Sequence, residues 1–319
     1  MPDACEQAGI RGIGTALPGR FAPLASLSLH SSAHALRQAG FEGAFVAEDS
    51  APLAVAAARA ALEDASVAPA EIDALFVAGA LPSAHHRASA QPTGGLLDGF
   101  CYTASWLQEE LEFDAATVCG IAQQGCAGMF SAIRTARDHL VAEPDLRHVL
   151  CVGADVLPAD LGREVMYNVI SDAACAVIVS RGENVRYRWR GYAQISKGYY
   201  WDVPARQAEI IAAYFPTARI TIERALQRAK LHAGGIDLVI PTGVQSASWP
   251  ILLRLCGIPE ERLYQPRHRF GHTIAADSFL LLEEAIRHGD VRTGMTILLF
   301  AYGFGSSWCA LVLEALSDS

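Results

Sequence analysis

The sequence predicts an α/β protein made of two similar halves. Apolar runs of strand length alternate with segments of helical periodicity along most of the 319 residues. The composition, 51% hydrophobic and only 18% charged, suits a large core in which helices cover a buried sheet. A stretch of the first half also matches a stretch of the second half without a gap. Together these observations predict halves at residues 1–182 and 183–319, each alternating helices with a mostly parallel sheet.

Charge, hydropathy and cysteine usage exclude several classes of protein. The net charge of −9 and the lack of a basic stripe argue against a nucleic-acid partner. We expect no membrane association and no secretion, because no apolar run reaches the roughly 18 residues of a membrane span and the N-terminus lacks a signal pattern. Eight cysteines without a Cys-x-x-Cys pair argue against a disulfide framework or a metal site, and favour the reducing cytoplasm.

The first elements follow from local patterns. Residues 10–18 are typical of an opening strand that ends in a turn, and residues 31–38 favour a short helix. Residues 51–65 predict a helix with a proline in its first turn, and residues 72–78 predict a buried strand. The Gly12-Ile-Gly14 pair lacks the third glycine and the downstream acid of a dinucleotide site, so we expect no such cofactor.

The stretch around Cys126 is the centre of the functional prediction. Residues 115–122 form a short apolar run expected to be a buried strand, and from Ala127 onward the pattern is helical. Cys126 therefore lies at a strand-to-helix turn, between Gly125 and Gly128, which leave room for a substrate. Unpaired backbone N–H groups and the helix dipole favour a thiolate at such a place. The alternative is an ordinary buried cysteine, but the turn favours a nucleophile.

An internal repeat supports the two-half organisation. Residues 61–79 align without a gap to residues 225–243. Two later pairs of apolar runs also resemble each other: 148–155 with 295–302, and 174–180 with 308–314. Helix–strand units look alike in general, so the strand pairs alone carry little weight. The gapless match favours duplication.

The second half carries two glycine-rich turns that we expect near Cys126. His272 follows a glycine just before a helix predicted to start near Ala275, and residues 301–307 form a small-residue loop between the last two strands. Loops at one edge of an open α/β sheet converge on the ligand. Two facing halves would therefore bring Cys126, His272 and the 303–305 loop together.

Six motifs in order along the chain carry a family resemblance. They are Gly12-Ile-Gly-Thr-Ala-Leu-Pro18, Cys126-Ala-Gly128, Val152-Gly-Ala-Asp155, Ser171-Asp-Ala-Ala-Cys-Ala176, Phe270-Gly-His-Thr-Ile-Ala-Ala276 and Tyr302-Gly-Phe-Gly305. With these motifs the chain resembles the thiolase superfamily, specifically β-ketoacyl-ACP synthase III and its acyltransferase relatives. The resemblance implies a five-layered αβαβα thiolase fold, an obligate homodimer, and a cysteine acylated from acyl-CoA or an acyl carrier protein. It implies no metal and no cofactor beyond these substrates.

The chain departs from the family at two motifs. Thr242, within Pro241-Thr-Gly-Val-Gln245, replaces the histidine of the usual Pro-His-Gln-Ala-Asn motif. His272 replaces the asparagine of Gly-Asn-Thr and resembles the Gly-His base of true thiolases. The family's arginine-rich segment after the first strand is also missing, and residues 39–45 stand in its place. These departures weigh against the usual carrier and against malonyl decarboxylation.

Roles for the site residues combine the pattern with the resemblance. Cys126 is the predicted nucleophile and His272 the predicted base, although a surface-loop histidine is the plain alternative for His272. The resemblance implies an oxyanion site formed by the Cys126 backbone N–H together with the loop of Gly303, Phe304 and Gly305. Thr242 and Gln245 are predicted to line the acceptor side as substrate-binding residues.

The sequence thus predicts a synthase III-like acyltransferase or condensing enzyme (EC 2.3.1), working by ping-pong through acyl-Cys126 in specialised metabolism. The alternative is a catalytically weakened subunit that partners an active paralogue, because the usual histidine is lost. The sequence leaves open the acyl chain, the acceptor, the choice between CoA and carrier protein, and homodimer against heterodimer.

Overall fold

The computed structural model describes residues 8–166, 168–182, 184–244 and 246–316. Its centre is a nine-stranded sheet in the order β11-β12-β13-β10-β1-β9-β6-β4-β5. These strands are β1 (Ala8–Ala16), β4 (Ala74–Ala78), β5 (Thr117–Ile121), β6 (His148–Asp155), β9 (Ala173–Arg181), β10 (Tyr187–Ser196), β11 (Leu238–Ile240), β12 (Thr296–Gly303) and β13 (Ser307–Ala315). Two small ribbons pair β2 (Phe21–Pro23) with β3 (Gly43–Phe45), and β7 (Glu164–Val165) with β8 (Asn168–Val169).

The α-helices pack on both faces of this sheet, except the first, which packs beside β2 and β3. They are α1 (Ala33–Gln38), α2 (Ala51–Ala65), α3 (Thr103–Glu110), α4 (Gly128–Ala142), α5 (Val203–Ala229), α6 (Ser248–Cys256) and α7 (Asp277–Arg287). Among the described residues, no helix is both long and apolar enough to cross a membrane.

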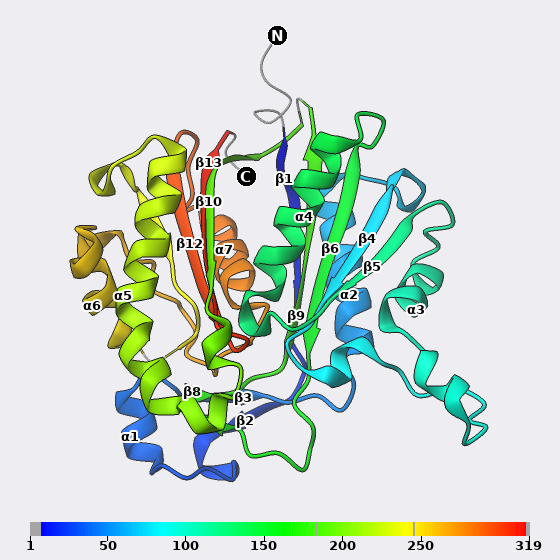
Figure 1. The fold of residues 1–319 in the computed structure, drawn as a ribbon, viewed down its shortest axis with the longest axis horizontal. Helices are drawn as coiled ribbons and strands as arrows, with labels where there is room; N and C mark the ends of the chain where they lie inside the picture. The colour runs from blue at the N-terminus through cyan, green and yellow to red at the C-terminus, as the bar shows by residue number, and fades with distance from the viewer. Residues whose placement is uncertain (1–7, 167, 183, 245, 317–319) are drawn as a thin grey trace.

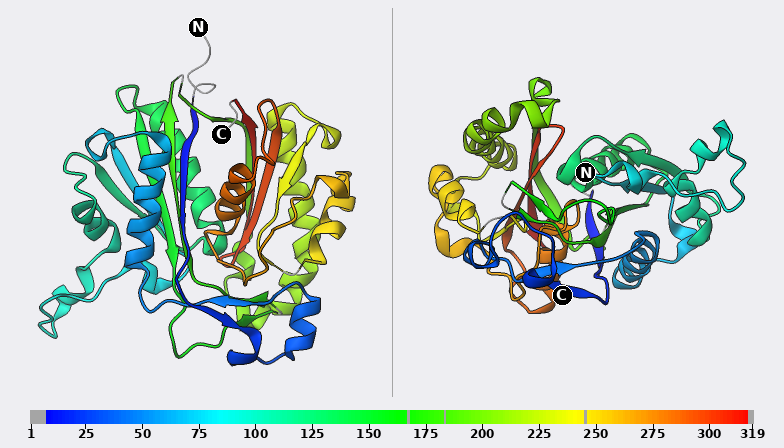
Figure 2. Two further views of the ribbon diagram at one scale, coloured as in Figure 1. Left: turned by 180° about the vertical axis from the view of Figure 1, so that it is seen from behind. Right: turned by 90° about the horizontal axis from the view of Figure 1, so that it is seen from below.

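The molecule has five layers because the sheet divides at its centre. The strands β1 and β10 pair only briefly, at Gly9 with Arg188 and Ile10 with Tyr187, and the two sides of the sheet then face each other. Figure 1 shows α4 and α7 between the two sides, with α5 and α6 outside one and α2 and α3 outside the other. Figure 2 shows the same order of layers from behind. The predicted αβαβα architecture is therefore confirmed.

The middle layer holds the two halves of the core together. Phe130 of α4 and Phe279 of α7 are both buried, and their rings lie 5.4 Å apart. Large buried aromatic side chains supply much of the apolar area of such a core. The two helices that meet here carry the candidate site residues at their N-terminal ends.

The prediction of a mostly parallel sheet is wrong. Only β4 with β5, β4 with β6, and β11 with β12 run parallel in the nine-stranded sheet. All its other pairs are antiparallel. Helical crossovers join the parallel strands, whereas β12 and β13 are joined by a tight turn that forces an antiparallel pair.

The prediction that residues 115–122 form a buried strand is wrong in its burial. The strand β5 exists, but Thr117, Cys119 and Gly120 are exposed. The reason is its place at the end of the sheet, where β4 is its only neighbour among the described strands. An apolar edge strand is open to pairing with another chain.

The two aligned segments of the predicted repeat have the same local structure. Helices α2 and α5 both end in a left-handed residue, Ser66 and Lys230. Asp73 and Asp237 then make equivalent contacts: the first accepts a hydrogen bond from His148 N at the start of β6, and the second from Thr296 N at the start of β12. This agrees with the alignment, while the boundary between residues 182 and 183 stays a prediction.

Candidate active site

Cys126 lies in the turn predicted for it. The short 3-10 helix η6 (Gly125–Ala127) follows β5 and leads directly into α4. Gly125 has a φ of +52°, in the left-handed region that favours glycine. Because the backbone turns sharply here, the Cys126 thiol lies beside the N-terminus of a 15-residue helix.

The turn between β12 and β13 packs directly against the Cys126 turn. A side chain on Gly303 would overlap the carbonyl of Gln124 and crowd the backbone nitrogens of Cys126 and Ala127. A side chain on Gly125 would overlap the backbone of Phe304 in return. Two backbones in such contact leave room only for glycine. The predicted meeting of Cys126 with the 303–305 loop is thus present in the structure.

His272 is buried and in contact with the thiol. Its imidazole Nε2 lies 3.1 Å from the Cys126 sulfur, and the residue is 7% exposed. The backbone fixes it on both sides, because His272 N donates to Val169 O at 2.7 Å and His272 O accepts from Ser171 N at 2.9 Å. The alternative of a surface-loop histidine is therefore excluded.

The structure adds Asp277, a residue that the sequence analysis missed. The Nδ1 atom of His272 contacts Oδ2 of Asp277, which is 3% exposed at the first turn of α7. Asp277 also accepts hydrogen bonds from the backbone N and the hydroxyl of Thr273, both at 2.6 Å, and from Gly243 N at 2.6 Å. Cys126, His272 and Asp277 form a continuous chain of contacts, which we call the triad.

The charges of the triad support each other. Burial alone would lower the pKa of His272, but Asp277 and Cys126 outweigh it and raise that pKa well above its ordinary value. Burial would raise the pKa of Asp277, yet His272 and Thr273 hold it below its ordinary value. A carboxylate next to imidazole fixes the tautomer that leaves Nε2 directed at the sulfur. The imidazole is therefore a strong acceptor for the thiol proton.

The absence of a side chain at Gly243 makes room for the Asp277 carboxylate beside His272. A Cβ atom at this position would lie 3.0 Å from Oδ1 of Asp277, so a larger residue would press on the carboxylate. Gly243 stands where the family's usual motif has glutamine. The exchange of that glutamine for glycine and the presence of an aspartate five residues after His272 are the sequence signals that could have predicted the triad.

Thr242, one of the two predicted acceptor-side residues, lies beside Asp277. Thr242 is 7% exposed, and its carbonyl accepts a hydrogen bond from the Trp249 indole at 3.3 Å. Thr242 and Asp277 both line a pocket that neither Cys126 nor His272 lines. Gln245 lies outside the described residues.

A network of polar side chains from β10 and α4 holds Gln124, which precedes the Cys126 turn. Gln194 of β10 donates to the Gln124 side chain at 3.0 Å, and Ser131 of α4 donates to the same oxygen at 3.3 Å. Tyr192 contacts the Gln194 oxygen at 2.9 Å. Through these contacts β10 and α4 hold the segment that precedes the thiol.

Comparison with known proteins places this geometry in a family. Residues 122–198 match the family described as 3-oxoacyl-[acyl-carrier-protein (ACP)] synthase III, and residues 226–315 match the C-terminal part of the same family. The two matches together cover more than half of the chain. The chain belongs to the synthase III family. Members of this thiolase-superfamily group are acyltransferases and condensing enzymes. The predicted enzyme class, EC 2.3.1, is therefore confirmed for this synthase III homologue.

Curated relatives of the synthase III homologue agree with this. The β-ketoacyl-[acyl-carrier-protein] synthase III of Staphylococcus haemolyticus is 28% identical over 280 residues, 84% of each chain. The Aquifex aeolicus enzyme of the same name is 26% identical over 275 residues, 82% of this chain and 83% of the relative.

Solved structures show the shared fold at lower identity. The acyltransferase ChlB3 superposes with a TM-score of 0.82 at 21% identity, with 98% of each chain covered. The synthase III of Pseudomonas aeruginosa gives a TM-score of 0.81 at 21% identity, covering 98% of this chain and 99% of the other. The priming β-ketosynthase of the R1128 polyketide pathway gives 0.77 at 22% identity, covering 100% and 99%.

Proposed function

We propose that this synthase III family member is an acyltransferase that carries its acyl group on Cys126 and passes it to a second substrate. The observation that carries the proposal is the 3.1 Å contact between the Cys126 sulfur and His272 Nε2, with Asp277 on the far side of the ring. A thiol, a base within hydrogen-bond reach and a group that orients the base are the parts needed for nucleophilic acyl transfer.

In the first half-reaction, His272 Nε2 takes the proton from the Cys126 thiol as the sulfur attacks the thioester carbonyl. The carbonyl oxygen becomes negative, and backbone N–H groups of Cys126 and of the 303–305 loop are its proposed donors. The carbon–sulfur bond to the donor then breaks, and the leaving thiol of CoA or of a carrier protein takes the proton back from His272. The product is acyl-Cys126.

In the second half-reaction, the acceptor attacks acyl-Cys126 as His272 removes the acceptor's proton. The Cys126 sulfur leaves and recovers that proton. Asp277 supports both steps, because its negative charge stabilises imidazolium each time His272 holds a proton.

The residues favour simple acyl transfer over malonyl decarboxylation. Decarboxylative condensation normally uses two polar partners to stabilise an enolate, and Thr242 stands where one of them would be. Thr242 can donate a hydrogen bond but cannot act as a base at neutral pH. We propose a role in specialised metabolism. Two structural relatives support that role by their names: ChlB3, an acyltransferase, and the priming β-ketosynthase of a polyketide pathway.

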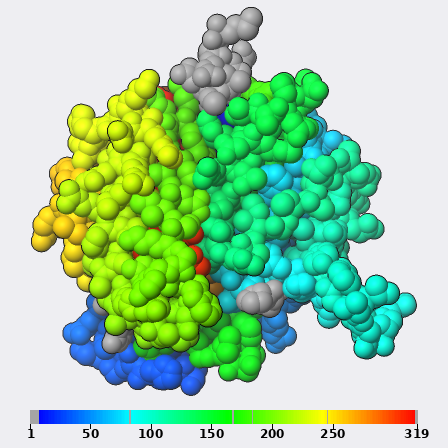
Figure 3. Space-filling view, viewed as in Figure 1, coloured from blue at the N-terminus to red at the C-terminus, as the bar shows by residue number. Residues whose placement is uncertain are grey.

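We propose a homodimer with the β5 edges together. The strand β5 ends the sheet with exposed residues, and the segment between β4 and α3 projects from the body beside it, in cyan at the lower right of Figure 3. That segment carries Leu96, Leu97 and Phe100 at 81%, 76% and 55% exposed. An edge strand and neighbouring apolar side chains together favour burial against a second copy.

A second candidate is a weakened subunit that pairs with an active paralogue. The replacement of the family's histidine by Thr242 favours it, while the intact triad favours an active enzyme.

One experiment separates the two candidates. The protein is mixed with each of a panel of acyl-CoA thioesters, and free CoA is measured with time. An active acyltransferase should release about one CoA per chain in a burst before steady turnover. A weakened subunit should release no CoA when it is alone, and CoA should appear only after a paralogue is added.

A further inference from the structure

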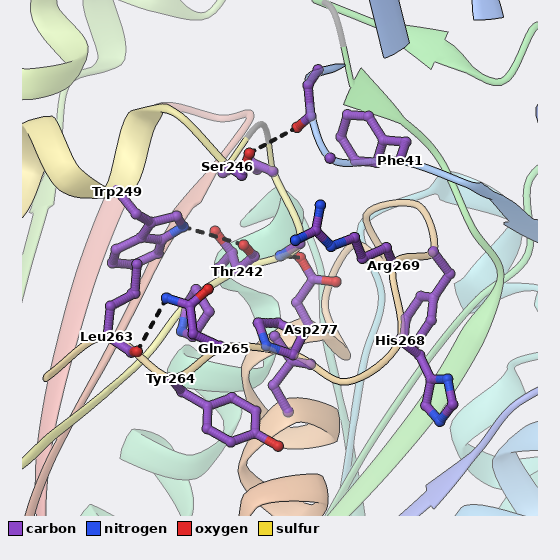
Figure 4. A pocket seen from close by; sticks show the side chains of 18 of the residues that line it. Phe41, Thr242, Ser246, Trp249, Leu263, Tyr264, Gln265, His268, Arg269 and Asp277 are labelled. Atoms are coloured by element: carbon purple, nitrogen blue, oxygen red, sulfur yellow. Dashed lines mark hydrogen bonds between the residues drawn. The ribbon is translucent and has the colours of Figure 1, made fainter. Parts of the chain in front are cut away.

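A pocket lies on the side of the triad away from the sulfur. Its volume is about 380 Å³, and it is lined by parts of residues 39–41, 241–244, 246–250, 263–270 and 277–281. Of the lining residues labelled in Figure 4, Thr242 and Asp277 are buried and Arg269 is exposed, so Arg269 lies where the pocket meets solvent. Cys126 and His272 do not line it. A molecule in this pocket would touch the acid of the triad and not the reacting sulfur.

The walls of this pocket are suited to an apolar body of ring size. Phe41, Trp249, Leu280 and Leu281 supply its apolar lining, and Thr242, Ser246, Gln265 and His268 add polar groups. A volume of a few hundred Å³ with apolar walls and few polar groups is usual for small-molecule sites. A bare inorganic anion would gain nothing from these walls.

The guanidinium of Arg269 is directed into the pocket. Figure 4 shows the guanidinium of Arg269 turned toward the pocket centre. Among the described residues, no side-chain acid or carbonyl bonds to it, whereas its neighbour Arg267 pairs with Asp290 at 3.2 Å. The nearest lining acid, Asp277, is already occupied by His272, Thr273 and Gly243. The guanidinium is therefore available to a ligand carboxylate, which it matches with two parallel hydrogen bonds.

We propose that this pocket is a second small-molecule site that binds an organic carboxylate with an aromatic or similarly compact apolar body. Arg269 holds the carboxylate at the opening, and the apolar body lies between Phe41, Trp249 and the leucines of α7. The site is separate from acyl-Cys126, so its occupation does not need a free thiol. It stands independently of the acyl-transfer proposal.

Calorimetric titration of the full chain with 2-naphthoate tests this site, with 2-naphthamide as the uncharged probe of the same shape. We expect 2-naphthoate to bind about tenfold more tightly than the amide, because only the carboxylate can form an ion-paired hydrogen bond with Arg269 and this contact is partly exposed. Arg269→Gln should remove that tenfold preference and leave the amide unchanged. Arg267→Gln, the matched control, should change neither.

Alkylation of Cys126 with iodoacetamide distinguishes the pocket from the acyl site. Binding of 2-naphthoate should be the same before and after alkylation. The proposal is overturned if alkylation abolishes binding, if acid and amide bind equally, if Arg269→Gln has no effect, or if no binding is seen up to about 5 mM. None of these readouts depends on acyl transfer, so they stay meaningful if Cys126 is never acylated.

Discussion

At the scale of single residues, the account depends on which group takes the thiol proton. His272 lies 3.1 Å from the sulfur, whereas Thr242 in the family's histidine place lines the pocket beside Asp277. His272→Ala should slow the acylation of Cys126 by roughly a hundred- to ten-thousand-fold, the usual range for loss of a general base. Thr242→Ala should leave acylation nearly unchanged and act on transfer to the acceptor. Stopped-flow release of CoA measures both variants, and the reverse pattern would show that the base is another residue.

Asp277 allows a sharper test of the triad. Asp277→Asn keeps the shape but removes the charge that supports imidazolium, so acylation should slow by at least about tenfold at pH 7. Asp277→Ala should in addition lower the free energy of unfolding by about 3 kcal/mol, because it leaves buried donors of Thr273 and Gly243 without an acceptor. Denaturant titration and single-turnover kinetics measure the two effects. Wild-type acylation in Asp277→Asn would remove Asp277 from the mechanism.

The charges of His272 and Asp277 also predict how stability depends on pH. The folded pKa of His272 is raised above 6.5, so its contribution is complete below 6.5 and is lost as pH rises through the raised value. The folded pKa of Asp277 is lowered below 3.8, so its contribution is present above 3.8 and is lost as pH falls through the lowered value. The stability advantage of the wild type over His272→Asn should therefore be largest between pH 3.8 and pH 6.5, where both contributions are complete. An advantage that grows steadily with rising pH would contradict the imidazolium–carboxylate pair.

The sequence was enough to predict that Cys126 and His272 lie close together, because glycines mark both turns. Gly125 and Gly271 stand where two backbones approach closely, and a glycine at such a position can be recognised in the sequence. The role of Asp277 could not be predicted from the sequence in the same way. An acid at the start of a helix is common because it complements the helix dipole, and only the folded chain shows that this carboxylate is directed at an imidazole.

At the scale of elements, the turn that carries Cys126 depends on the neighbouring β12–β13 turn. Gly303→Ala would place a Cβ against Gln124, Cys126 and Ala127, so we expect a loss of more than about 2 kcal/mol of stability and slower acylation. Gly19→Ala is the control, because nothing lies near that position. Thermal unfolding and CoA release together measure the change. If Gly303→Ala matches Gly19→Ala in both, the packing of the two turns is not needed.

The errors at this scale have a common physical cause. Local periodicity shows that residues 117–121 form a strand, but exposure is set by strand order, and β5 has a neighbour on one side only. The direction of strands is likewise set by connections. The repeat predicted similar halves, yet the hairpin from β12 to β13 and the place of β9 between β1 and β6 make the sheet mixed.

At the scale of the whole molecule, the exposed β5 edge predicts assembly. Light scattering at micromolar concentration should give about twice the chain mass of 34.1 kDa. Leu96→Glu with Leu97→Glu, on the projecting segment, should shift the protein toward monomer if that segment is buried in the dimer, because charges are costly to bury. Exposed Ile220→Glu on α5 serves as the control and should leave the mass unchanged. A monomeric wild type would contradict the dimer, and a mixed assembly with a paralogue would favour the partner-subunit alternative.

The central claim, that Cys126 carries the acyl group, is tested most directly by mass. The wild type and Cys126→Ala are each incubated with the acyl-CoA that gives the CoA burst, quenched in acid and digested. We predict that the peptide containing Cys126 gains the mass of the acyl group in the wild type, and that no peptide gains it in Cys126→Ala. Equal labelling of the two proteins, or labelling at a different residue, would contradict the account.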